Sequence, residues 1–261
     1  MDPAPVARVE LLEGFTLDIE GCRGGVSDGL PRGVQRLVAL LGVSRQPTRT
    51  AIAGLLWPDV PEVHAQGSLR SALWRLSKMA PGLIRARRDT LSLAEGVQVD
   101  VHELTCWARQ VSDPATSVDH LAATQLRLRG ELLPGWYDDW VLLERDRLRQ
   151  LRMHALEALA DRLAAAGRYG EAVQAACVAM QAEPLRESAH RTLIRVHLAE
   201  GNLIEAVHAY ESFQALLAGE LGVVPSRLMR DLVDGLPVRD TGRAALLTDG
   251  VPGPRSPAPS Y

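Results

Sequence analysis

The chain has 261 residues, enough for about two domains of ordinary size, and its formal net charge of −3 excludes the overall basicity of a histone-like protein but not a local basic surface. No run of about 18 apolar residues occurs, which excludes a membrane-spanning helix, and the N-terminal segment MDPAPVARVE lacks the basic and apolar regions of a secretory signal. Cys22, Cys106 and Cys177 lie too far apart for a CxxC metal or redox pair, so we expect small buried side chains in a cytoplasmic protein.

The first elements in chain order are short strands, followed by a helix. Apolar and polar residues alternate within residues 6–30, and glycines interrupt them, which predicts strands joined by turns. After Pro31 the period changes, because Val34, Leu37, Val38 and Leu41 follow the i, i+3, i+4, i+7 spacing of one helix face.

Two more helices and a hairpin complete the N-terminal part. Thr48 or Thr50 is placed to cap a second helix that ends before Pro58, and a third helix is predicted from Glu62 to Met79. Segments 83–87 and 91–93 then predict a hairpin with Arg88, Asp89 and Thr90 at its tip. Strands, three helices and a hairpin form the element order of a winged helix-turn-helix, which we assign to residues 1–100.

The second part of the chain is predicted to be helical. We expect helices at about 101–112, 117–130, 137–166, 170–182, 186–200, 203–219 and 226–234. They form an all-α domain over residues 101–234, which makes the whole protein mainly α with a small β component. Residues 235–261 are rich in Pro, Gly and Ser, so we expect a disordered tail there.

An internal repeat specifies the type of helical domain. The segment GRYGEAV from Gly167 matches GNLIEAV from Gly201, an offset of 34 residues, which is the period of tetratricopeptide repeats. In each copy a glycine is placed to end one helix, and Ala172 or Ala206 allows the next helix to pack closely. The helices are therefore predicted to stack as a short solenoid.

The third helix carries the clearest candidate site. At about 100° per residue, Leu69, Leu73 and Leu76 share one face and form the predicted core side. The other side and its margins carry Gly67, Ser68, Arg70, Ser71, Trp74, Arg75 and Lys78. Arginine and lysine donate to guanine O6 and N7 in a major groove, and serine pairs with several base edges. The alternative is an ordinary solvated helix face. For Trp74 we expect packing against the second helix or the neighbouring domain, and the other possibility is contact with sugar and thymine methyl groups.

Further basic residues surround this helix. The hairpin carries Arg85, Arg87 and Arg88, which are placed to reach a phosphate or the adjacent minor groove. Thr48 and Arg49 are placed for a phosphate contact at the start of the second helix. Between Glu62 and Thr90 six basic residues stand against two acidic ones, a net charge of +4 in a chain that is negative overall.

Enzyme motifs are missing from the sequence. Lys78 is the only lysine and no Gly-Lys precedes a Ser or Thr, so a P-loop is excluded, and neither GxSxG nor HExxH occurs. The histidines lack metal-ligand spacing. The adjacent Asp138 and Asp139 point apart on a helix, and we assign them to a helix N-terminus rather than to a catalytic pair. We therefore expect no catalytic, metal or cofactor site.

The sequence also resembles a known family. The stretches LPRGVQRLVALL, AIAGLLWPDVPE, SLRSALWRLSK and LIRARRDTLSLAEGVQVDVHEL are similar to the OmpR-type winged helix of the Streptomyces antibiotic regulatory proteins. The following stretch, from LRGELLPGWYDDW to ELGVVPS, resembles their bacterial transcriptional activation domain. The resemblance covers about residues 6–234. For a chain that is complete as given, it implies a small-type member without the nucleotide-binding and sensor domains of larger relatives.

The resemblance implies a function. It implies an activator of a secondary-metabolite gene cluster, in which two protomers bind direct repeats of promoter DNA and recruit RNA polymerase holoenzyme with its sigma factor. By position, Gly67, Ser71, Arg75 and Lys78 match the base-facing residues of an OmpR-type recognition helix. Trp74 and the Ser77-Lys78 pair depart from many relatives, so the recognised bases do not transfer. Two alternatives remain: a helical scaffold whose winged helix does not bind DNA, and a regulator that binds a ligand in the concave repeat surface.

Overall fold

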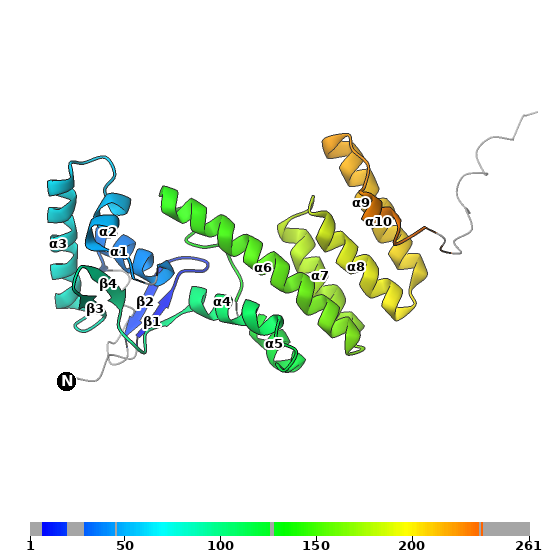
Figure 1. Ribbon diagram of the computed structural model, residues 1–261, viewed down its shortest axis with the longest axis horizontal. Coiled ribbons are helices and arrows are strands. Elements are labelled where there is room, and N and C mark those ends of the chain that lie inside the picture. Colours follow the sequence, from blue (N-terminus) through cyan, green and yellow to red (C-terminus); the bar gives the residue numbers. More distant parts are fainter. Residues whose placement is uncertain (1–6, 20–28, 45, 126–127, 235, 237–261) are drawn as a thin grey trace, which may run out of the picture.

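The computed structural model describes residues 7–19, 29–44, 46–125, 128–234 and 236. The winged-helix elements lie at one end of an elongated molecule, and the helical repeats lie at the other (Figure 1). Cys22 and the expected tail at 235–261, except Leu236, fall outside the described residues. Among the described helices, none combines the length and hydropathy that a membrane crossing needs.

The N-terminal half contains two small sheets and three helices. Its elements are β1 (Ala7–Glu10), β2 (Thr16–Ile19), α1 (Arg32–Val43), α2 (Arg49–Leu56), α3 (Glu62–Met79), β3 (Ile84–Arg87), β4 (Thr90–Leu93) and β5 (Gln98–Val99). The first sheet has the order β2-β1-β5, with β1 antiparallel to β2 and parallel to β5. The predicted helices and hairpin are present, whereas β5 was not predicted because two residues carry no periodicity.

The helix termini and the hairpin follow from local chemistry. The Thr48 hydroxyl accepts a hydrogen bond from the backbone N–H of Ala51 at 3.2 Å, so Thr48 rather than Thr50 caps α2. In the hairpin Arg87 pairs with Thr90, which leaves a two-residue tip of Arg88 and Asp89 instead of the expected three. Arg88 has a φ of 52°, as the twist of a two-residue hairpin requires.

The C-terminal half is helical throughout its described elements. These are α4 (Asp100–Val111), α5 (Val118–Gln125), α6 (Asp139–Ala165), α7 (Tyr169–Ala182), α8 (Glu187–Glu200), α9 (Leu203–Leu221) and α10 (Arg227–Arg230). Gly167 and Gly201 follow α6 and α8 with φ values of 74° and 84°, and both helices turn into the next one there. Ala172 and Ala206 are fully buried. The 34-residue repeat is therefore a pair of helical hairpins, as predicted.

The two halves share a core and several polar contacts. One cluster of buried apolar side chains extends from β1 and α1–α3 through α4 and α6 to α8. The Asp100 carboxylate accepts the backbone N–H groups of Leu11 and Leu12, each at 2.8 Å. Arg36 on α1 pairs with Asp138, the residue before α6. The winged helix is thus fixed to the helical half rather than tethered by a linker.

Two side-chain expectations outside the site have different outcomes. Cys106 is exposed and Cys177 is half-buried, so the expectation of small buried cysteines is wrong for Cys106. Asp138 and Asp139 do lie at the N-terminus of α6, although the Asp138 side chain makes no capping hydrogen bond and pairs with Arg36 instead.

The buried His190 on α8 gives the fold a predicted pH dependence. Its ring contacts the Pro184 carbonyl oxygen at 2.8 Å and stacks on Phe213. Burial lowers the pKa of His190 below its ordinary 6.5, against a smaller raising effect of the Pro184 hydrogen bond. The unfolded chain therefore binds the proton more tightly than the folded one. We expect stability to fall as the pH drops through 6.5 toward the lowered pKa.

The measurement is the thermal midpoint on either side of pH 6.5 for the wild type and two variants. His190→Gln should reduce the acid-dependent decrease of the midpoint, whereas His64→Gln, at an exposed position on α3, should leave it unchanged. An equal decrease in wild type and His190→Gln would assign the pH dependence to other groups.

Candidate nucleic-acid interface

Helix α3 separates a buried apolar face from an exposed polar one. Leu69 and Leu76 are each 1% exposed, and Leu73 is half-buried against the core. The opposite side presents Arg70, Ser71, Trp74, Arg75 and Lys78 to solvent, with Gly67 and Ser68 half-buried at its N-terminal margin. The predicted division of this helix into a core face and an exposed polar face is confirmed.

Neighbouring residues fix the orientation of α3 and engage some of its polar groups. The Gln66 side chain donates to the Thr50 hydroxyl at 3.5 Å, which links α3 to α2. Ser71 donates its hydroxyl proton to the carbonyl oxygen of Gly67 at 3.1 Å. The Ser71 oxygen keeps its acceptor capacity, so Ser71 is best suited to accept from a base amino group.

A hollow lies beside the polar face, and one of its lining residues, His64, was not predicted from the sequence. Arg70, Ser71 and Arg75 line it together with His64 from the same helix. Pro31 and Gly33 from the start of α1 and Trp57 at the end of α2 complete the wall. His64 precedes Ser71 and Lys78 by multiples of seven residues, so the helical spacing already indicated its place on this face.

The three arginines of the β3–β4 hairpin differ in exposure and in their ion-pair partners. Arg87 and Arg88 are exposed at the tip. Arg85 is half-buried and pairs with Glu95 at 2.5 Å, so its charge is partly neutralised within the fold. The backbone N–H of Arg49 donates to the Asp89 carbonyl at 2.8 Å, which fixes the hairpin tip against the start of α2. Of the three, Arg87 and Arg88 are the arginines most available to a ligand.

The start of α2 has fewer free hydrogen-bond donors for a phosphate than the sequence predicted. Thr48 uses its hydroxyl oxygen to cap Ala51, and the backbone N–H of Arg49 is already bonded to Asp89. A helix N-terminus binds anions through unpaired N–H groups, and two of these donors are therefore engaged. The half-buried guanidinium side chain of Arg49 is what remains for a phosphate contact.

Trp74 is the unexpected member of the polar face. It is 63% exposed, so the interpretation that it packs on α2 or on the neighbouring half is wrong. An indole of this size on a helix surface has apolar area to offer to a ligand, such as sugar carbons or a thymine methyl group.

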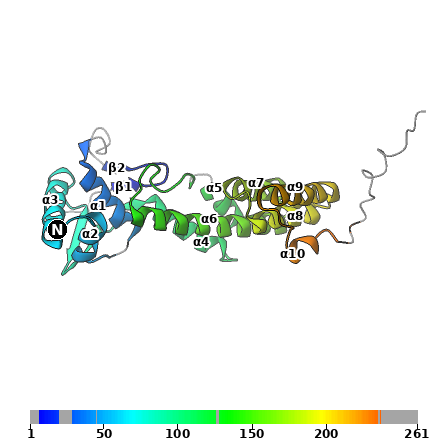
Figure 2. The ribbon, with the colours of Figure 1, turned by 90° about the horizontal axis from the view of Figure 1, so that it is seen from above.

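The position of α3 decides whether a large ligand can reach these side chains. In both views α3 lies at the end of the molecule farthest from α7–α9 (Figures 1 and 2), and the β3–β4 hairpin follows it in the chain at the same end (Figure 1). The side chains of Arg75, Lys78 and Arg87 are exposed to solvent in the folded chain. This arrangement leaves room for a rigid, extended and acidic ligand along α3.

Comparison with known proteins finds relatives among curated sequences and among solved structures. The chain is 29% identical over 234 residues to "Regulatory protein AfsR" of Streptomyces coelicolor, covering 85% of this chain and 23% of that protein. It is 29% identical over 226 residues to "Regulatory protein AfsR" of Streptomyces griseus, covering 79% of this chain and 22% of that protein. The chain thus spans about a quarter of the length of these relatives.

One solved structure that the chain resembles is that of Mycobacterium tuberculosis EmbR in complex with a low-affinity phosphopeptide. It superposes with a TM-score of 0.71 at 21% identity, and the match covers 88% of this chain and 64% of that chain. At this level of identity the match supports the fold: a winged helix-turn-helix followed by a helical domain.

The family model for the bacterial transcriptional activator domain matches residues 101–236, which is more than half of the chain. The matched region spans all the helices from α4 to α10 except the first residue of α4. Together with the relatives above, this match confirms the resemblance to the Streptomyces antibiotic regulatory proteins, and the chain belongs to the bacterial transcriptional activator domain family.

Proposed function

We propose that this protein is a transcriptional activator that binds promoter DNA through α3 and the β3–β4 hairpin. The observation that carries the proposal is the exposed face of Ser71, Arg75 and Lys78 at the open end of the winged helix. A major groove admits one helix, and arginine and lysine at these positions meet guanine acceptors there. We propose no catalytic role and no cofactor for this site.

The contacts divide into two classes by the chemistry of the side chains. Arg75, Lys78 and Ser71 are proposed to contact base edges, with Trp74 against sugar or thymine methyl groups. Arg87 and Arg88 at the hairpin tip, with Arg49, are proposed to contact phosphates or the adjacent minor groove. Arg85 is proposed to contribute less to DNA binding, because its charge is paired with Glu95.

The finer aspects of the proposal rest on the family resemblance. We propose that residues 1–100 bind DNA and that residues 101–234 contact the second protomer and RNA polymerase holoenzyme with its sigma factor. Two protomers on direct repeats gain affinity because the second binding event is intramolecular. The expected targets are secondary-metabolite genes, and the site of action is the nucleoid in the cytoplasm.

The single lysine of the chain provides a direct test. Lys78 is the only lysine in the sequence and lies exposed on α3, so acylation of lysine reports on this one position. We expect DNA from the promoter region of the protein's own gene neighbourhood to slow acylation of Lys78 several-fold, because a side chain inside the groove is shielded from the reagent. The readout is mass spectrometry of the peptide that contains Lys78.

The control is DNA of the same length and composition with a shuffled sequence. At a salt concentration that removes non-specific binding, only the promoter fragment should protect Lys78. Labelling that stays unchanged while a gel shift shows a stable complex would place the DNA on another surface. The absence of any complex would favour the scaffold alternative.

A further inference from the structure

A second pocket lies in the helical half, away from α3. It has a volume of about 640 Å³, opens to solvent, and is lined by α4, α6, α7 and the segment that leads from α5 to α6. Its walls are mainly apolar, with Trp107, Leu128, Leu148, Leu156 and Val178 among the lining residues. This volume and composition are usual for sites that bind small molecules.

The charged residues of the pocket are unevenly paired. Four arginines and two carboxylates line it, a net charge of +2. Arg145 is engaged by Glu131 at 2.9 Å and by three carbonyl oxygens of the segment before α6, and Arg149 pairs with Asp146. Arg129 and Arg152 remain, and neither forms an ion pair with a carboxylate among the described residues.

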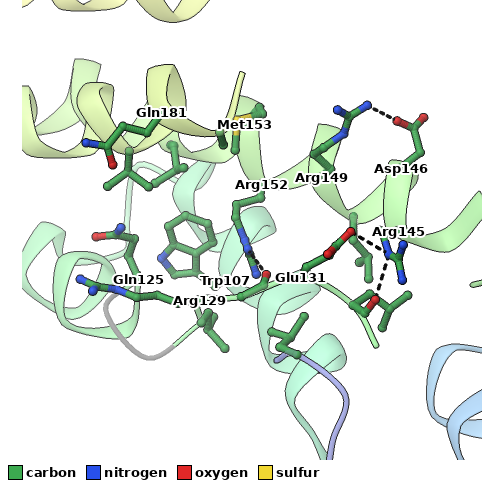
Figure 3. A pocket seen from close by; sticks show the side chains of 18 of the residues that line it. Trp107, Gln125, Arg129, Glu131, Arg145, Asp146, Arg149, Arg152, Met153 and Gln181 are labelled. Atoms are coloured by element: carbon green, nitrogen blue, oxygen red, sulfur yellow. Dashed lines mark hydrogen bonds and ion pairs between the residues drawn. The ribbon is translucent and has the colours of Figure 1, made fainter. Parts of the chain in front are cut away.

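Arg152 lies at the centre of the pocket, beside the indole of Trp107 and close to Glu131 (Figure 3). It donates one hydrogen bond, to the carbonyl oxygen of Gly130, and its Nε is buried without a partner. Burial lowers the pKa of Arg152, although Asp100 and Glu13 act in the opposite direction at longer range. A buried guanidinium donor without an acceptor is costly, and an anion that supplies one relieves that cost.

We propose that this pocket binds a small amphipathic acid. Its carboxylate lies against Arg152 and Arg129, and its apolar body lies along Trp107, Leu156 and Val178. The buried, unpartnered Nε of Arg152 favours an anion, and the exposed Arg129 adds a second positive charge to the pocket lining. The apolar wall favours a hydrocarbon or aromatic body of modest length. A neutral compound of the same shape contacts the apolar wall but supplies no negative charge to the arginines.

The pocket is linked to the winged helix by backbone hydrogen bonds of one of its wall segments. Gly130 and Glu131 belong to the segment that hydrogen-bonds the residues between β1 and β2, since the N–H of Glu13 donates to the Glu131 carbonyl at 2.9 Å. Leu133 donates to the Leu11 carbonyl at 2.8 Å. A ligand held by Arg152 therefore contacts the segment at residues 130–132, which is hydrogen-bonded to the winged helix.

The test is isothermal titration of the full chain, without DNA, with octanoate and with the neutral 1-octanol. We expect octanoate to bind at least about tenfold more tightly, the effect of one charge-assisted hydrogen bond. Equal affinity of the two probes would overturn the assignment of an anion, and no binding of octanoate at millimolar concentration would overturn the site itself. Because DNA is absent, the result does not depend on the proposed function.

Variants locate the site. Val178→Trp fills the pocket and should abolish octanoate binding, whereas Ala218→Trp, at an exposed position of α9, should leave it unchanged. Arg129→Gln should weaken binding about tenfold compared with Arg230→Gln on α10, and Arg129 is exposed, so the variant should keep its fold. Unchanged binding in both Val178→Trp and Arg129→Gln would place the probe elsewhere and refute the proposal.

Discussion

Replacing Arg75 with alanine is expected to weaken specific promoter binding by about 1–3 kcal/mol, or roughly 5- to 150-fold in the dissociation constant. Arg75 is exposed near the middle of the polar face of α3, where a guanidinium reaches base acceptors from a helix seated in the groove. The preference of the protein for its site over shuffled DNA should fall with it. The measurement is a titration of labelled promoter DNA by fluorescence anisotropy at fixed salt.

Two further variants separate base contacts from phosphate contacts. Arg88→Ala at the hairpin tip should weaken binding to promoter and shuffled DNA alike and reduce the slope of log K against log salt by about 1. Arg230→Ala on α10, exposed but far from α3 along the molecule, serves as the matched control and should change neither quantity. If Arg75→Ala retained wild-type affinity and salt slope, the docking face proposed here would be wrong.

The burial pattern of α3 was predictable because it depends on local spacing alone. Leu69 and Leu76 recur at the helical period and are buried, and the same period placed Arg75 and Lys78 on the exposed side. The repeat at Gly167 and Gly201 was predictable for a similar reason, since each copy specifies its own turn. Where the residues that decide a structure are near neighbours in sequence, the pattern is sufficient.

Contacts between distant residues were not predictable in this way. Glu95 neutralises part of Arg85 across the base of the hairpin, and no periodicity indicates that pair. Trp74 was interpreted as packed because exposed indoles are uncommon, but its environment depends on the placement of a neighbouring half that periodicity cannot supply. The role of Asp100 was also missed, because its partners Leu11 and Leu12 lie 89 and 88 residues away.

Asp100 is the site of the second large expected effect. Asp100 is 6% exposed, and its carboxylate accepts three backbone N–H groups, those of Leu11, Leu12 and Val101. Asp100→Ala leaves the amides at the end of β1 without acceptors, and each buried amide left unpaired costs about 1–3 kcal/mol. We expect a corresponding loss in the free energy of unfolding, measured by urea denaturation.

The matched variant Asp100→Asn separates the role of the oxygen acceptors from that of the charge. Burial raises the pKa of Asp100 despite the N–H donors that lower it, so the environment does not favour the charge as such. Asparagine keeps one acceptor oxygen and should lose less stability than alanine. Because Leu11 and Leu12 also contact the segment at Leu132 and Leu133, Asp100→Ala should loosen the winged helix from the helical half. Faster amide exchange at both Leu11 and Leu133 would be the sign of this, whereas a stability loss without it would mean that Asp100 supports α4 alone.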